Sequence, residues 1–170
     1  MYYVLMHKYS NQADIVIGTP VSNRHYSQLE GLVGFFVNSL ALRQRIDVQS
    51  YRDLIQEVHQ MVLESQHNQD LPFERLVEVL TIERDSSRHP IFQVMFGLQN
   101  FGESQSDYFK AVDIGGYDVS KYDLSLFMSD SLQIKGSFEY STSLYTKDSI
   151  LRLVEHYKTC LLYTSDAADD

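Results

Sequence analysis

The chain has 170 residues, of which 44% are hydrophobic and 22% are charged, and its formal net charge is −9. These values are typical of a globular protein that can bury one sizeable core. Because nucleic-acid binding relies on clustered lysines and arginines, the acidic charge argues against a nucleic-acid partner. The sequence has no apolar stretch of membrane-spanning length and no signal-peptide pattern. The single cysteine, Cys160, cannot form an internal disulfide, so we expect a cytoplasmic protein.

The first half of the chain predicts helices that alternate with buried strands. Residues 2–9 have the apolar character of a helix end. Residues 15–18 predict a short buried strand that ends at Pro20, and the continuous apolar run of residues 35–43 predicts another strand. Residues 50–66 predict an amphipathic helix, because serine and aspartate at its start have the spacing of a capping box.

Residues 68–92 combine a helix start with a charged loop. Pro72 predicts the first helical position, with Leu71 as the cap, because a backbone N–H would lack a partner there anyway. Glu74 would then occupy the third position, where a carboxylate can reach back to a free N–H. Residues 84–90 include two arginines and an aspartate directly before an apolar strand. Spacing alone favours a charged loop there over a group of structural ion pairs.

The second half of the chain predicts strands followed by a helix. Alternation over residues 92–98, with apolar residues on both faces, predicts a central strand. Residues 112–114 suggest another strand, and residues 123–141 predict a β-hairpin. Residues 146–161 have the apolar stripe of a final helix. Helices interleaved with strands predict an α/β or α+β layer sandwich.

The residues themselves predict no self-contained catalytic site. The six histidines are scattered, and none has the paired spacing of a helical zinc motif, so we expect no metal site. No glycine-rich phosphate loop and no nucleophile elbow is present. Cys160 lies on an apolar helical face and is expected to be a core residue.

Three motifs, in order, resemble those of the condensation domains of non-ribosomal peptide synthetases. Residues 33–39 resemble the family's Gly-x-Phe-Val-Asn-Thr element and are followed by Arg43. Residues 68–74 resemble (His/Asn)-Gln-Asp-x-Pro-Phe-Glu. Residues 84–91 resemble Arg-Asp-x-Ser-Arg-Asn-Pro-Leu, with His89 in place of the asparagine. The resemblance runs from about residue 4 to residue 162.

The resemblance implies that most motif residues are structural. In particular, it favours a fixed structural junction over a plain charged loop at residues 84–91. The residues with implied structural roles are Gly34, Phe36, Arg43, Gln69, Asp70, Pro72, Phe73, Glu74, Arg84, Asp85, Arg88 and Pro90.

The resemblance also implies a fold and a domain organisation. The expected fold is an α/β two-layer sandwich, one chloramphenicol acetyltransferase-like half of a condensation domain. Residues 1–162 would form its C-terminal subdomain, truncated at the N-terminus, and the small acidic residues 163–170 a disordered or non-native tail. The family's His-His-x-x-x-Asp-Gly signature, which lies in the preceding half, is absent. We therefore identify no catalytic residue and expect this chain alone to be inactive.

The activity implied is amide formation. A condensation domain transfers a carrier-bound acyl or peptidyl thioester to the amine of a carrier-bound aminoacyl acceptor, inside a tunnel between two halves. The implied partners are the donor and acceptor peptidyl carrier proteins, the missing N-terminal condensation subdomain and the adjacent adenylation domain. The carriers bring phosphopantetheine arms, and no cofactor binds directly. No nucleic-acid or membrane partner is expected.

Two residues are candidates for the tunnel wall. Asn38 keeps an amide within an otherwise apolar strand, although it could equally serve only to satisfy backbone groups. Arg24 is the second candidate. Two other functions stay open: a non-catalytic fragment or docking platform for carrier proteins, and the related epimerisation domain, which residues 36–39 fit less well.

Overall fold

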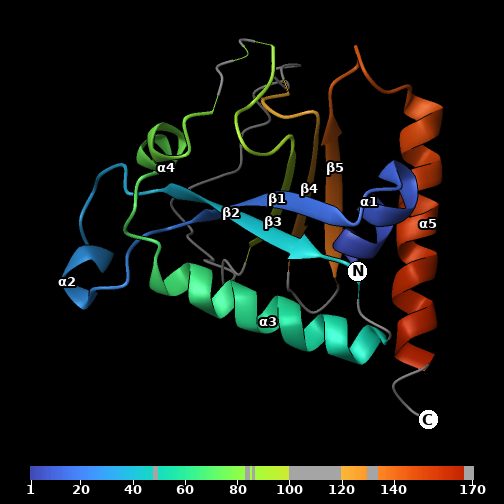
Figure 1. Cartoon of the computed structure of the whole chain (residues 1–170), viewed down its shortest axis with the longest axis horizontal. Helices are drawn as coiled ribbons and strands as arrows, with labels where there is room; N and C mark the ends of the chain where they lie inside the picture. The colour runs from blue at the N-terminus through green and yellow to red at the C-terminus, as the bar shows by residue number, and fades with distance from the viewer. Residues whose placement is uncertain (48–49, 83–84, 86, 100–119, 130–133, 167–170) are drawn as a thin grey trace, which may run out of the picture.

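A computed structural model describes residues 1–47, 50–82, 85, 87–99, 120–129 and 134–166. Five helices and five strands alternate along these residues (Figure 1). In chain order the elements are α1 (Tyr2–Ser10), β1 (Asp14–Val21), α2 (Ser27–Glu30), β2 (Asn38–Arg45), α3 (Tyr51–His67), α4 (Phe73–Val79), β3 (Val94–Gln99), β4 (Leu124–Ser129), β5 (Lys135–Tyr140) and α5 (Lys147–Asp166).

The five strands form one mixed sheet in the order β2-β1-β3-β4-β5. The outer pairs, β1 with β2 and β4 with β5, are antiparallel, whereas β3 runs parallel to both β1 and β4. β3 is therefore the central strand, as its two apolar faces predict. β2 and β5 are the edge strands of the described sheet, and β2 borders the candidate site discussed below.

Helices α1, α3 and α5 cover one face of the sheet and bury the main core. Leu5 of α1 and Leu126 of β4 are almost fully buried, and Ile17 and Leu42 present side chains from β1 and β2 to the same cluster. Each fully buried side chain of this kind contributes about 1.5–3 kcal/mol of hydrophobic stabilisation. The Tyr3 hydroxyl adds a hydrogen bond of 2.8 Å to the Leu42 carbonyl, which fixes α1 on β2.

The opposite face of the sheet is covered differently. Helix α4 lies apart from the other helices, near the start of β2 (Figure 1). Phe73 and Val77 of α4 pack with Phe92, Met95 and Tyr122 in a second, smaller core. The structure is therefore a sheet with three helices on one face and a short helix with an aromatic cluster on the other.

The structure differs from the predicted elements in where three of them begin or end. β2 begins at Asn38, so residues 35–37 of the predicted strand lie in the loop before it. β1 continues through Pro20 to Val21, because Pro20 pairs with Ser39 near the end of the strand and has no N–H that must be satisfied there. Helix α4 begins at Phe73, with Pro72 rather than Leu71 as its cap.

The predicted hairpin is confirmed as the antiparallel pair β4 and β5, and Ile134, just before β5, is 72% exposed. The predicted strand at residues 112–114 and the hairpin turn lie outside the described residues.

A glycine in β1 makes the close contact between the sheet and the second core possible. A Cβ on Gly18 would lie 2.0 Å from Cε2 of Phe92, whose ring is 1% exposed and cannot move freely. We expect Gly18→Ala to lower the free energy of unfolding by about 1–3 kcal/mol, the usual cost of overpacking a tight core. In urea denaturation this loss appears as a lower midpoint concentration, while the dependence of the unfolding free energy on urea concentration stays unchanged.

Gly31→Ala is the matched control for Gly18→Ala. No heavy atom lies within 4 Å of a Cβ at Gly31, and its backbone φ of −87° suits any residue. We expect a change of less than about 0.5 kcal/mol. Equal midpoints for the two variants would contradict the close packing of Phe92 on Gly18.

Candidate functional site

Three chain segments meet beside the start of β2 and enclose a cavity of about 360 Å³. They are the loop after β1, the first residues of β2, and the turn between α3 and α4. We call this space the β2 cavity. It is lined by Asn23, Phe35, Phe36, Val37, Asn38, Ser39, Asp70, Pro72, Phe73, Glu74, His89 and Lys121.

The Asn38 side chain connects the edge strand to the α3–α4 turn. Its Nδ2 donates to the carbonyls of Gln69 and Leu71, each at 2.8 Å. Its Oδ1 accepts from the N–H of Ser39 at 2.9 Å and from that of Phe73 at 3.1 Å. Two donors and two acceptor positions are all that a side-chain amide has, so Asn38 is saturated.

Asn38 also caps a helix from a distance. The first N–H groups of a helix have no partner within the helix, and the cap residue Pro72 makes no side-chain hydrogen bond to them. Asn38 Oδ1 supplies the missing acceptor for Phe73, across 35 residues of chain. Glu74 lies one position closer to the cap than predicted, and its side chain makes no hydrogen bond to the start of the helix among the described residues.

Arg24 organises the loop between β1 and β2. Its guanidinium donates to the carbonyl of Leu29, to that of Leu32 at 2.7 Å and to that of Gly34 at 3.2 Å. Its Cζ also lies 4.2 Å from the centroid of the Phe36 ring, a cation–π contact. Arg24 therefore holds the predicted motif around Gly34 and Phe36 in its place beside the cavity.

A further contact joins this loop to the α3–α4 turn. His25 Nε2 lies 3.4 Å from Oδ1 of Asp70. The first two predicted motifs thus meet where Asn38 binds the backbone of Gln69 and Leu71, and His25, which lies outside the first motif, adds the contact with Asp70.

The third motif joins the site through aromatic rings. The ring of His89 lies 5.1 Å from that of Phe73, 4.6 Å from that of Phe92 and 4.8 Å from that of Tyr122, between centroids. His89 and Phe73 also line a neighbouring cavity of about 530 Å³, which Pro90 borders. His89, the residue that departs from the family motif, therefore lies between two cavities.

The hydrogen bonds of His89 fix its tautomer. Nδ1 lies 2.9 Å from the Pro90 carbonyl and 3.2 Å from the Phe92 carbonyl. Carbonyl oxygens only accept, so Nδ1 carries the proton, and in the neutral ring Nε2 is an acceptor. Burial is the main cause that lowers the pKa of His89 below its ordinary value of 6.5, and the Lys121 ammonium adds to it.

The charged part of the third motif forms a turn. Asp85 Oδ1 accepts from the Ser87 N–H at 2.8 Å and from the Ser87 hydroxyl at 2.6 Å, and these bonds are the main cause that lowers the pKa of the carboxyl. Arg88 is exposed and donates its backbone N–H to the Asp85 carbonyl at 3.2 Å. No ion pair joins Asp85 to Arg88 in the described part of the chain, and Arg84 lies outside it.

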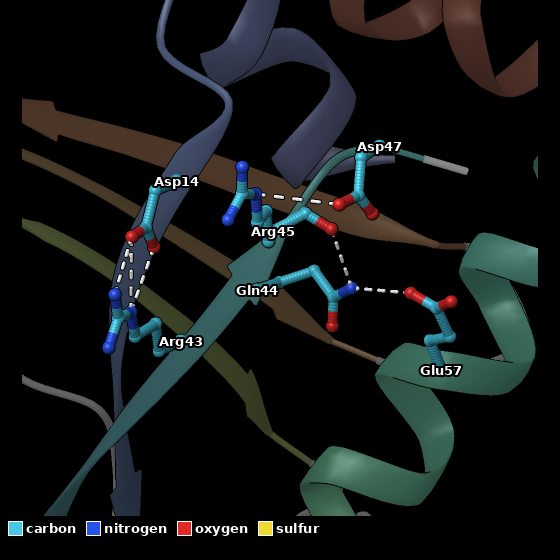
Figure 2. A network of polar contacts seen from close by, with 6 residues as sticks. All are labelled: Asp14, Arg43, Gln44, Arg45, Asp47 and Glu57. Carbon is cyan, nitrogen blue, oxygen red and sulfur yellow. Dashed lines mark hydrogen bonds and ion pairs between the residues drawn. The ribbon is translucent and has the colours of Figure 1, made fainter.

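Arg43 acts at the other end of β2, away from the cavity. Its Nε and Nη2 donate to the Asp14 carboxylate at 2.9 and 2.6 Å, which lowers the pKa of Asp14 and ties β2 to β1 (Figure 2). The buried Gln44 donates from Nε2 to Glu57 at 2.8 Å and so ties β2 to α3 (Figure 2). This network is structural, in line with the role that the resemblance implies for Arg43.

The described residues contain no group of three or more His, Cys, Asp or Glu side chains placed to hold a metal ion. None of the helices among them combines the length and apolar character needed to cross a membrane. Sequence reasoning missed Asn23 and Lys121, which line the cavity, and His25, which contacts Asp70 beside it. Their signal in the sequence is weak, because each stands singly beside a turn or strand start.

The first prediction for this site concerns Asn38. Asn38→Asp keeps an acceptor for Phe73 but turns two donors into an oxygen that faces two carbonyls. We expect the free energy of unfolding to fall by about 2–3 kcal/mol, the cost of two lost hydrogen bonds with repulsion added. Asn68→Asp, which changes an exposed amide with one bond to the Glu64 carbonyl, should cost at most about 1 kcal/mol. Equal losses of unfolding free energy in the two variants, measured by thermal or urea denaturation, would contradict the role of Asn38 in holding the α3–α4 turn on β2.

The second prediction concerns the titration of His89. Its pKa in the folded chain is lower than in the unfolded chain, so the unfolded chain binds the proton more readily. Stability from this group is therefore complete above about pH 6.5 and is lost as the pH falls from that value through the lower pKa of the folded chain. His89→Asn removes the titration, and the other histidines stay common to both chains.

Unfolding free energies at about pH 7.5 and about pH 5.5 test this prediction. The chain with His89 should lose more stability on acidification than the His89→Asn variant. Parallel pH profiles for the two chains would show that His89 is not held in its neutral form.

Comparison with known proteins agrees with the motifs. A sequence model of the condensation domain matches residues 1–169. Gramicidin S synthase 2 of Aneurinibacillus migulanus is 40% identical over 162 residues, which are 92% of this chain and 4% of that synthase. The chain thus spans a small part of this relative.

Solved structures give the same result for the fold. A four-domain nonribosomal peptide synthetase bound to AMP and glycine matches with a TM-score of 0.78 at 30% identity, over 90% of this chain and 13% of that one. The condensation domain from the monacolin K polyketide synthase MokA matches with a TM-score of 0.77 at 24% identity, over 92% of this chain and 38% of that one. The chain therefore belongs to the condensation-domain family and has the chloramphenicol acetyltransferase-like α/β fold of these structures.

Proposed function

We propose that residues 1–162 form the C-terminal subdomain of a peptide-bond-forming condensation domain in a cytoplasmic nonribosomal peptide synthetase. The acceptor amine attacks the carbonyl carbon of the donor thioester. The C–N bond forms, the C–S bond breaks, and the donor carrier's phosphopantetheine leaves as a thiol that takes up the amine's proton. The partners are a donor and an acceptor peptidyl carrier protein, the N-terminal condensation subdomain and an adjacent adenylation domain.

The observation that carries this proposal is the convergence of the three family motifs on one cavity. Asn38, Asp70 and His89 come from different motifs and line the same space. The cavity lies with α4 on the side of the sheet opposite to α1, α3 and α5. A cavity in this place can position thioester arms and exclude water once a second subdomain covers it.

Exposed apolar side chains beside the cavity support the need for a second subdomain. Val33 and Phe35 are almost completely exposed, and Leu32 and Val37 are more than half exposed. A contiguous apolar segment of this kind marks an interaction surface. We propose that the N-terminal subdomain, which would carry the His-His-x-x-x-Asp-Gly signature, packs against it.

The division of roles follows from the contacts. Asn38 and Arg24 bind backbone groups, so on this proposal they shape the tunnel wall and do not bind substrate. The proton-accepting or amine-orienting group would come from the N-terminal subdomain. A second candidate function, a carrier-protein docking platform without turnover, is favoured by the same exposed apolar segment.

Reconstitution tests the proposal. Residues 1–162 replace the matching segment of the gramicidin S synthase 2 condensation domain, and product formation from loaded donor and acceptor carriers is followed by mass spectrometry. We expect the chimera to form the amide, because the parent supplies the signature motif. We expect the chain alone to form none.

Two controls complete this experiment. Substituting the second histidine of the parent's signature motif should abolish product formation by the chimera. A folded chimera that binds both carriers but forms no amide would support the docking platform instead. Product from the chain alone would overturn the division of the site between two subdomains.

A further inference from the structure

We propose that the sheet contains a hinge between β1 and β3, and that the side chain of His89 is a strap that holds this hinge closed. The hinge lets the two blocks of the described sheet, β1–β2 and β3–β4–β5, move against each other. It stands apart from the proposed function, because it depends only on strand pairing, on one turn and on the cavities beside them.

The pairing between β1 and β3 is the shortest in the described part of the sheet. These two parallel strands are paired there at one position, Gly18 with Met95. By contrast, β1 pairs with β2 along its whole length, and β3 with β4 and β4 with β5 along theirs. In Figure 1 the pair β1–β2 runs across the view, whereas β4 and β5 run upright. The two blocks therefore share little backbone pairing along the seam between β1 and β3.

A strained turn positions the aromatic ring that fills this seam. Phe92 packs on Gly18 and is almost fully buried. Its backbone N–H donates to the Pro90 carbonyl at 2.9 Å, and Ile91 between them has a φ of 71°. These features define the rarer, positive-φ form of a γ-turn, which is strained for a β-branched residue. Such strain persists only where neighbouring groups hold the backbone in place.

The His89 imidazole bridges the two ends of this turn. Its Nδ1 donates to the Pro90 carbonyl at 2.9 Å and to the Phe92 carbonyl at 3.2 Å. The Gln93 side chain adds a hydrogen bond of 3.0 Å from Nε2 to the His89 carbonyl. Without the bonds of the imidazole, Ile91 can return to a negative φ, and the ring of Phe92 can leave the seam.

Cavities on both faces of the sheet leave room for this movement. Beside the main core, a cavity of about 410 Å³ is lined from β1 by Ile15 and Val16 and from the turn and β3 by Ile91 and Val94. Beside the second core, His89 lines both the β2 cavity and the neighbouring cavity of about 530 Å³. Because close-packed interiors resist displacement, empty space next to the turn is what allows its conformation to change.

Opening of the hinge would widen the β2 cavity. Asn38 lines this cavity from β2, whereas His89 and Lys121 line it from the segments that precede β3 and β4. The two sides of the cavity thus belong to different blocks of the sheet. The hydrogen bonds of Asn38 to the α3–α4 turn can stay intact while the blocks separate. His89 therefore controls the width of the cavity through the turn that it holds.

Amide hydrogen exchange of the native chain, followed for each residue by NMR, tests the hinge. In β3 successive N–H groups point alternately toward β1 and toward β4, so the strand contains its own control. A hinge makes the amides that point toward β1, among residues 94–96, exchange through a local opening. We expect them to exchange at least about tenfold faster than the amides of β3 that point toward β4.

His89→Phe separates the strap from the packing of the ring. Phenylalanine keeps an aromatic ring beside Phe73 and Phe92 but lacks the Nδ1 donor. We expect the exchange of the seam amides to become about tenfold faster, as for the loss of one or two hydrogen bonds. The amides between β3 and β4 should keep their exchange rates, which a general loss of stability would raise as well.

Glycine and alanine at position 91 separate the strain from lost contacts. Ile91→Gly and Ile91→Ala both remove the side chain beyond Cβ, but only glycine adopts a positive φ without strain. We expect the seam amides to exchange at least about threefold more slowly in Ile91→Gly than in Ile91→Ala. At a position with ordinary φ the order is the reverse, because glycine gives the opened chain more freedom. Circular dichroism verifies the fold of each variant.

Three results would overturn the inference. Equal exchange on the two sides of β3 in the unaltered chain would show that the seam does not open by itself. Equal acceleration of all amides by His89→Phe would assign His89 a general structural role. Exchange in Ile91→Gly that is as fast as in Ile91→Ala, or faster, would show that the turn is not strained. The chimera tests the proposed function separately, and its activity leaves the hinge unaffected.

Discussion

The structure depends on one connection, where the chain passes from one face of the sheet to the other between α3 and α4. Helix α3 belongs to the main core, and α4 belongs to the aromatic cluster on the opposite side. The crossing runs past the first residue of the edge strand β2, and Asn38 binds it there through three hydrogen bonds to backbone groups. Because Asn38 belongs to the sheet, it fixes the height and direction at which α4 starts. These hydrogen bonds also set the position of Phe73, and His89 packs against the ring of Phe73.

The two faces of the sheet are covered unequally, which on the proposed function suits the chain to a place in a larger domain. Three helices bury one face of the sheet in a continuous core, so that face is complete without a partner. On the other face, a seven-residue helix and an aromatic cluster leave the apolar segment of residues 32–37 largely exposed. Hydrophobic surface of this kind is unfavourable in water and is stabilised by association. The same asymmetry therefore accounts for the fold of the chain and for the wall that it would present to a second subdomain.

The sequence predicted the elements better than the contacts that connect them. Periodicity placed the central strand and the amphipathic helix, because these patterns report burial on one or two faces of a local element. The roles of Asn38 and Arg24 depend on carbonyls up to 33 residues away, and a carbonyl has no side-chain pattern that a sequence could reveal. The motif resemblance drew attention to Asn38, whereas its contacts with the backbone required the structure. The capping of α4 by a strand residue is a case of the same kind, since local rules assign caps to neighbours in sequence.

The polar groups around the β2 cavity separate into two classes by their hydrogen bonds. Asn38 spends its full hydrogen-bonding capacity on the protein's own backbone, and Arg24 donates three hydrogen bonds to backbone carbonyls. Asn23 has a buried oxygen without a donor among the described residues, and His89 holds an imidazole where the resembled motif has an asparagine. The residues that shape the cavity are therefore not the ones that leave hydrogen-bonding capacity unused beside it. On the proposed function, substitutions at Asn23, His89 or Lys121 should change the chemistry of the cavity without releasing the contacts of Asn38 that shape it.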